Sequence, residues 1–128
     1  MTRATIRIDL AANVPAFRQI ANSLRALLVD NAFQSGQQLP TIRQLAIDLG
    51  VHPNTVADAY RVLADEGWIE MRRRHGVRVI NRRTPNATAA MHESFSRRFR
   101  ELVAEARGAG VGEKTITDIL RRAAGGLI

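Results

Sequence analysis

The chain has 128 residues, carries a formal net charge of +7 and contains no cysteine. This length allows one domain with a modest core, or one domain with a small appendage, and the lack of cysteine excludes disulfides and thiolate metal sites. No apolar run approaches the roughly 18 residues of a membrane span, and the first residues lack the apolar stretch of a secretory signal, so we expect a soluble cytoplasmic protein without a membrane partner.

A short extended segment and an amphipathic helix are predicted first. Residues 5–9 alternate apolar and polar side chains, which indicates a short strand or an extended arm. Pro15 suits the first turn of a helix, where the missing N–H of proline costs nothing. Apolar residues then recur at helical spacing as far as Asn31, and Ser35-Gly36 is typical of a turn. We therefore expect the first helix over residues 15–31.

Two short helices joined by a tight turn are predicted next. Thr41 and Gln44 have the spacing of a capping box, which opens a helix that Gly50 can end. Pro53 can open another helix only three residues later. The apolar side of that helix consists of Val56, Tyr60 and Leu63. Two short helices around a glycine-containing turn are what a helix-turn-helix requires.

A basic β-hairpin is predicted after these helices. Residues 68–71 and 77–80 have the composition of two strands, and Gly76 between them can adopt a positive φ. Six arginines and no carboxylate lie between Met71 and Arg83. A solvated surface is the ordinary explanation of such a run, but three helices followed by a hairpin is the element order of a winged helix-turn-helix. We expect this mainly α fold with a small β-hairpin over residues 1–82.

A helical tail is predicted over residues 83–128. Residues 81–87 have the composition of a linker, and two amphipathic helices follow on either side of the glycine-rich segment 108–112. Two such helices cannot enclose a core alone, so we expect a homodimer built by this tail; folding back onto the first domain is the alternative. The expected dimerisation residues are Met91, Phe95, Phe99, Leu102, Ile116, Ile119 and Leu120.

Several segments together resemble the GntR family of bacterial transcription regulators, over about residues 5–80. The matching segments are residues 15–20, 36–46, 53–60 and 66–70. The proline before Asn54-Thr55-Val56 and the short tail are similar to the YtrA subfamily, whose members carry two helices after the DNA-binding domain. The resemblance implies a dimeric regulator, usually a repressor, that binds an inverted repeat in double-stranded DNA.

The helix that begins at Pro53 is expected to enter the major groove. With its apolar side in the core, Asn54 and Thr55 face outward, where Asn can pair with adenine and Thr can contact a thymine methyl; local helix capping is the alternative for both. His52 either caps this helix or touches a phosphate. The resemblance assigns Arg43 to DNA contact. The expected DNA-contacting residues are Thr41, Arg43, His52, Pro53, Asn54, Thr55, Arg61, Arg72, Arg73, Arg74, His75 and Gly76.

Three positions depart from the pattern of the family. Asp58 stands where a basic residue is more common, and it can either accept a hydrogen bond from cytosine or pair with Arg61 three residues on; we favour the ion pair. Arg74 stands where the hairpin more often has glycine, and Arg78 where it has an aromatic or similar residue. These departures leave the operator sequence open.

Two other classes of function remain to be separated from a DNA-binding regulator. One is a protein-interaction adaptor whose basic surface binds an acidic partner. The other is an enzyme or nucleotide-binding protein, because residues 108–115 superficially resemble a phosphate-binding loop. However, Glu113 stands where that loop requires glycine, and a helix rather than a strand is predicted before it. The three histidines also lack metal-ligand spacing, so we expect no enzyme activity, no cofactor and no metal; a small-molecule effector stays open.

Overall fold

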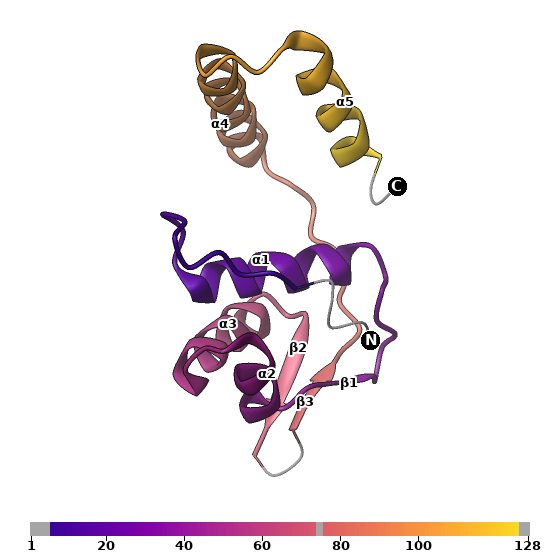
Figure 1. Ribbon diagram of the computed structural model, residues 1–128. Helices are drawn as coiled ribbons and strands as arrows, with labels where there is room; N and C mark the ends of the chain where they lie inside the picture. Colours follow the sequence, from indigo (N-terminus) through magenta and orange to yellow (C-terminus); the bar gives the residue numbers. More distant parts are fainter. Residues whose placement is uncertain (1–5, 74–75, 126–128) are drawn as a thin grey trace. The chain divides into compact units, whose positions relative to one another are not determined.

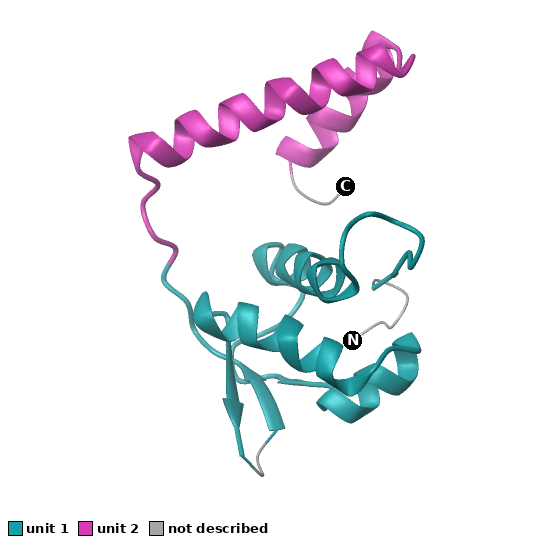
Figure 2. Cartoon of the chain, turned by 90° about the vertical axis from the view of Figure 1, so that its left-hand side faces the viewer, with its two compact units in different colours: residues 1–83 teal, residues 84–128 magenta. Residues whose placement is uncertain are grey.

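The computed structural model describes residues 6–73 and 76–125. The chain divides into two compact units, Met1–Arg83 and Thr84–Ile128 (Figure 2). The first unit contains α1 (Ala16–Val29), β1 (Gln38–Leu39), α2 (Ile42–Leu49), α3 (Pro53–Asp65), β2 (Ile69–Arg72) and β3 (Gly76–Val79), and the second contains α4 (Ala89–Gly108) and α5 (Glu113–Ala124) (Figure 1). The predicted fold class, mainly helical with a small antiparallel sheet, is confirmed.

The turn between α2 and α3 has the local signals that the sequence predicted. The side chain of Thr41 accepts a hydrogen bond from the backbone N–H of Gln44, and the side chain of Gln44 accepts one from the N–H of Thr41, both at 3.1 Å. Gly50 ends α2 at a φ of 70°, a left-handed conformation that favours glycine. Pro53 is then the first residue of α3.

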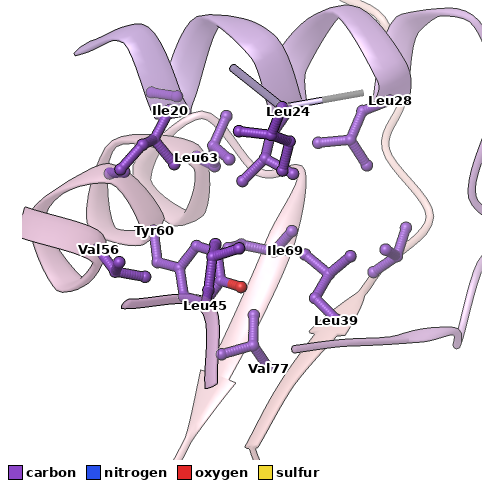
Figure 3. Packing of buried hydrophobic residues seen from close by; sticks show 14 of the residues in the cluster. Ile20, Leu24, Leu28, Leu39, Leu45, Val56, Tyr60, Leu63, Ile69 and Val77 are labelled. Carbon is purple, nitrogen blue, oxygen red and sulfur yellow. The ribbon is translucent and has the colours of Figure 1, made fainter. Parts of the chain in front are cut away.

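The core of the first unit lies between α1, α3 and the inner side of the sheet (Figure 3). Its side chains are spaced three or four residues apart on the helices and two apart on the strands, as one buried side of each element requires. The labelled core residues are Ile20, Leu24, Leu28, Leu39, Leu45, Val56, Tyr60, Leu63, Ile69 and Val77. Burial of an aliphatic side chain contributes about 1.5–3 kcal/mol, so this cluster holds α3 in one rotational setting.

The sheet has three strands where the sequence predicted a two-stranded hairpin. β1 joins the edge of the hairpin, giving the antiparallel order β1-β3-β2. A strand of two residues shows no alternation that a sequence pattern could detect, which explains why β1 was not predicted. The hairpin strands themselves lie one residue from their predicted positions.

The N-terminal segment forms an arm rather than a strand. Residues 6–9 have no strand partner in the described structure, and Ile6 is buried in the core. The arm is attached to α1 through Gln19, whose side chain donates to the carbonyl of Asp9 at 2.9 Å and accepts from its N–H at 2.8 Å. α1 also ends two residues earlier than predicted, because Asn31 adopts a positive φ of 59°.

Tyr60 joins α3 to the segment that leads into α2. Its ring is fully buried, and its hydroxyl donates to the backbone carbonyl of Pro40 at 2.7 Å. Burial also raises the pKa of this hydroxyl, so it remains protonated and can donate at neutral pH.

Tyr60→Phe is expected to lower the free energy of unfolding by about 1 kcal/mol. The substitution keeps the ring but leaves the carbonyl of Pro40, which is only partly exposed, without this donor. Urea unfolding would measure the change as a lower midpoint with an unchanged slope. An unchanged midpoint would show that water replaces the tyrosine hydroxyl at no cost.

A polar network lies at the C-terminal end of α3. The carboxylate of Glu66 accepts hydrogen bonds from Arg25 Nε at 2.8 Å, Arg25 Nη2 at 2.6 Å and Trp68 Nε1 at 2.9 Å. Arg82 donates through Nε to the backbone carbonyl of Glu66 at 2.9 Å, and its guanidinium lies 4.1 Å from the centre of the Trp68 ring. The hydrogen bonds from Arg25 are the main reason that the pKa of the Glu66 carboxyl lies below its ordinary value.

Glu66→Gln is expected to make stability less sensitive to acid. Because the folded-state pKa of Glu66 is lowered, its contribution is complete above the unfolded value near 4.5 and is lost as the pH falls through the folded value. Thermal unfolding from about pH 7 to about pH 3 should therefore show a shallower decline for the variant than for the original chain. Glu93→Gln, on α4, is the matched control, and equal declines for Glu66→Gln and the original chain would contradict the assignment.

The second unit consists of the two predicted tail helices. The side chain of Thr88 caps α4 by accepting from the N–H of Met91 at 3.1 Å. The turn between the helices is closed by a hydrogen bond from the N–H of Val111 to the carbonyl of Ala106 at 2.9 Å. Among the described residues, neither α4 nor α5 has a buried side chain. The unit therefore has two helices but no core of its own.

Candidate nucleic-acid interface

α3 presents a polar outer side because its opposite side is locked in the core. Val56, Ala59, Tyr60 and Leu63 are fully buried. The residues that fall on the other side at helical spacing are exposed, and these are Asn54, Asp58 and Arg61. Thr55, which the sequence also placed outside, is half-buried. The outer side can form hydrogen bonds with base edges and phosphates.

The N-terminus of α3 is capped by His52. Its Nδ1 accepts a hydrogen bond from the N–H of Asn54 at 3.0 Å. The capping role left open for Asn54 and Thr55 therefore belongs to His52. Since Nδ1 of a neutral imidazole accepts only when Nε2 carries the proton, the exposed edge of His52 is a donor. That edge lies at the N-terminus of α3, where the helix dipole favours the negative charge of a phosphate.

Asp58 and Arg61 form the ion pair that the sequence favoured. Arg61 Nη1 donates to Asp58 Oδ1, and both side chains are more than half exposed. An exposed pair three residues apart on a helix is weak, about 0.3–0.5 kcal/mol. A phosphate can therefore compete for Arg61.

α2 adds an arginine beside this surface. α2 packs against α3, and Arg43 is an exposed residue in the first turn of α2. Thr41 is also exposed, but its side chain is engaged in the capping box. Arg43 thus has the freer position for a contact outside the protein.

The wing (residues 69–79, formed by β2 and β3) is the third part of the surface. β2 packs against α3, which places the wing next to the helix-turn-helix. Arg72 and Arg73 are exposed, and Gly76 has the positive φ that was predicted, 78°. Arg74 and His75 lie outside the described residues. Their predicted contacts stay predictions.

Glu70 is a wing residue whose role the sequence reasoning missed. Its Oε1 accepts from Arg72 Nε at 2.7 Å, and its Oε2 accepts from Arg78 Nη2 at 3.0 Å. Glu70 lies just outside the run of arginines between Met71 and Arg83, so that run did not indicate it. The signal was nevertheless present, because strands over 68–71 and 77–80 meeting antiparallel set Glu70 opposite Arg78, as observed.

The described residues show neither a metal site nor a membrane helix. No group of three or more histidine, aspartate or glutamate side chains within residues 6–73 and 76–125 could hold a metal ion. In the same part of the chain, no helix is long and apolar enough to cross a bilayer.

Comparison with known proteins identifies the family. The family described as bacterial regulatory proteins, gntR family, matches residues 16–79, from the start of α1 to the end of β3. The chain belongs to the GntR family. A GntR-type match that ends with β3 covers the whole surface described above and none of the tail.

Two relatives extend the similarity into the tail. The HTH-type transcriptional regulator Rv1152 of Mycobacterium tuberculosis is 35% identical over 119 residues, covering 93% of this chain and 91% of the relative. The HTH-type transcriptional repressor YtrA of Bacillus subtilis is 29% identical over 106 residues, covering 83% and 82%. This GntR-family chain is thus similar over most of its length to short regulators, and its relatives are regulators rather than enzymes.

Solved structures also match this chain to the GntR family and its fold. YtrA from Sulfolobus acidocaldarius, a GntR-family transcription factor, is 31% identical with a TM-score of 0.58, covering 81% of this chain and 98% of that one. A transcriptional antiterminator from Listeria monocytogenes has a TM-score of 0.74 at 22% identity, which supports the fold alone. The chain is a DNA-binding transcription regulator of the GntR family with a YtrA-like architecture.

Proposed function

We propose that this GntR-family regulator acts as a homodimeric repressor on an inverted-repeat operator in double-stranded DNA. The observation that carries the proposal is the polar outer side of α3, held in one setting by the core and flanked by Arg43 and the wing. A rigid helix with cationic neighbours is what sequence-specific binding in the major groove requires. Access to chromosomal DNA implies a cytoplasmic location, which is part of the proposal.

Each part of the surface has a distinct proposed contact. Asn54, free of the capping role, reads adenine in the major groove. His52 Nε2 holds a phosphate at the N-terminus of α3, where the helix dipole favours negative charge. Arg43 binds DNA beside them, and Arg61 exchanges Asp58 for a phosphate. The wing contacts the DNA sugar-phosphate backbone or a narrow minor groove. The residues that make these contacts are Arg72, Arg73, Arg74, His75 and Gly76.

Thr41 and Thr55 have smaller parts in this proposal than the sequence suggested. The hydroxyl of Thr41 accepts the N–H of Gln44 within the capping box, so its O–H can donate to a phosphate only in the side-chain position that the cap fixes. Thr55 is half-buried, so contact through its methyl group requires close approach of a base edge. We therefore assign both residues secondary contacts.

Exposed apolar side chains of the second unit support the homodimer. On α4, Met91, Phe95 and Leu102 are 57%, 68% and 62% exposed, and Ile119 on α5 is 55% exposed. Phe99, Ile116 and Leu120 are only partly buried. Side chains of this size gain about 1.5–3 kcal/mol each when they leave water. A second copy of the same helices is an occupant that can bury them.

The charged residues beside the apolar side chains of α4 can form ion pairs with those of a second copy of the helix. Arg98 and Glu105 line the same groove as Phe95, Phe99 and Leu102, and they stand two turns apart on one side of the helix. An antiparallel two-fold pairing of α4 with its copy sets Arg98 of each chain opposite Glu105 of the other. Such a self-complementary surface is suited to a closed dimer.

Light scattering during a DNA titration tests the proposal. The free protein should have the mass of two chains, and one duplex carrying the operator should bind two chains. Transcription in vitro from a promoter that contains the operator should fall as protein is added. Operator affinity should also decrease steeply with salt, since about six phosphate contacts per chain release counterions. A monomer that binds one chain per duplex, or no effect on transcription, would reject the dimeric repressor.

A further inference from the structure

The outer side of the wing sheet carries a charged cluster of three residues, Glu70, Arg72 and Arg78. The strand register sets Glu70 directly opposite Arg78, and Arg72 lies two residues further along β2 on the same side. Glu70 hydrogen-bonds both arginines, one through each carboxylate oxygen. These bonds lower the pKa of the carboxyl group, with Arg72 contributing most, so the group is charged at neutral pH.

The inner side of the sheet fixes this arrangement. Ile69, Val77 and Val79 alternate with the charged residues and are buried in the core. A shift of one residue in strand pairing would turn these apolar side chains into water. The register, and with it the position of Glu70 between two guanidinium groups, is therefore set by core packing.

The hydrogen bonds to Glu70 orient the two arginines but use only one N–H donor of each. A guanidinium has five N–H donors, and Glu70 takes one from Arg72 and one from Arg78. Both side chains are also exposed, 57% for Arg72 and 44% for Arg78, so their guanidinium groups can reach a phosphate, but each is restrained to the sheet surface. The carboxylate also repels any phosphate that comes within about 10 Å.

The restraint on Arg72 and Arg78 weakens non-specific DNA binding more than it weakens operator binding. Non-specific binding consists of phosphate contacts that mobile arginines can make in many arrangements. Operator binding holds the wing in one position through the base contacts of α3, where a pre-oriented arginine loses less freedom. An Arg72 or Arg78 side chain that is released from Glu70 would thus stabilise the non-specific DNA complex more than the operator complex.

We infer that Glu70 is a positioning residue that determines specificity, because it restrains Arg72 and Arg78 and so limits the binding of DNA that lacks the operator. The inference rests on the proposed contact between the wing and DNA. Glu70 itself touches no base or phosphate in this account. Its partner is the pair of arginines on the same sheet.

Glu70→Gln tests the inference, since it removes the charge and keeps the size. Affinities for an operator duplex and for a scrambled duplex would be measured by fluorescence anisotropy at several salt concentrations. The scrambled duplex should bind the variant about fivefold more tightly, with a salt slope steeper by about one phosphate contact. Operator affinity should rise less, so the ratio of the two affinities falls. Glu70→Ala should behave in the same way.

Glu93→Gln is the control, because it removes one negative charge from α4. It should leave the ratio of operator to scrambled affinity unchanged. If both Glu70 variants keep the original ratio, or change it only as Glu93→Gln does, the inference is overturned. If the original chain itself does not prefer the operator, the proposed function fails first, so the two failures are distinguishable.

Discussion

Arg43→Ala is expected to weaken operator binding by about 100-fold. A good hydrogen-bonded arginine contact with DNA contributes about 1–3 kcal/mol, and the proposed dimer makes the contact twice. Arg43 is exposed at the start of α2 and lies outside the buried core, so the change in stability should stay within about 0.5 kcal/mol. Fluorescence anisotropy with an operator duplex and a thermal melt of the same sample measure both quantities.

Arg107→Ala is the matched control for Arg43→Ala. It removes the same side chain from the exposed end of α4, so it reports the effect of lowering the net charge alone. We expect a change of less than about threefold for this variant. Equal affinities for Arg43→Ala and Arg107→Ala would remove the main contact assigned to α2.

Phe95→Glu is expected to convert the dimer into a monomer and to lower operator affinity by at least about 100-fold. Phe95 is the most exposed large apolar side chain of α4, and its ring lies 5.8 Å from that of Phe99. A carboxylate there would be buried without a partner in the dimer. Once the chains separate, each DNA-binding domain binds alone, and the gain from linked binding, about 10²–10⁴, is lost.

Ala104→Glu is the control for the dimer variant. Ala104 lies nine residues from Phe95, on the opposite side of α4, and is exposed. It introduces the same charge without entering the apolar side. Light scattering should find Ala104→Glu dimeric and Phe95→Glu monomeric. If Phe95→Glu remained dimeric with full operator affinity, another surface would have to join the chains.

The helices, and the ends that enclose the turn between α2 and α3, were predictable because their signals are local; the end of α1 was not. Thr41 and Gln44 stand three residues apart, and Gly50 and Pro53 mark a turn within four residues. The outward direction of Asn54 follows from the spacing of its buried neighbours. Any fold that buries the same side of α3 would therefore leave Asn54 on the outside.

Features that depend on distant pairing were not predictable in this way. β1 is too short to show a pattern and exists because β3 offers an edge. Glu66 finds Arg25 from 41 residues away, with no local signal for either partner. Glu70 is intermediate, since its partner Arg78 follows from the hairpin register but not from the local charge run. The positions of the candidate site residues were therefore predicted on the helices and less completely on the wing, and their contacts with DNA stay predictions.

Selection of DNA fragments from a random pool by the purified chain tests whether α3 reads an inverted repeat as part of a two-fold dimer. We expect enriched fragments that contain two half-sites in inverted orientation, at a constant spacing near one helical turn of about 10 base pairs or a multiple of it. The inversion would report the two-fold symmetry of the dimer, and the conserved bases would report what α3 reads. A pool that gains no common sequence would contradict sequence-specific binding by α3, and a single half-site without its inverted copy would contradict the two-fold dimer.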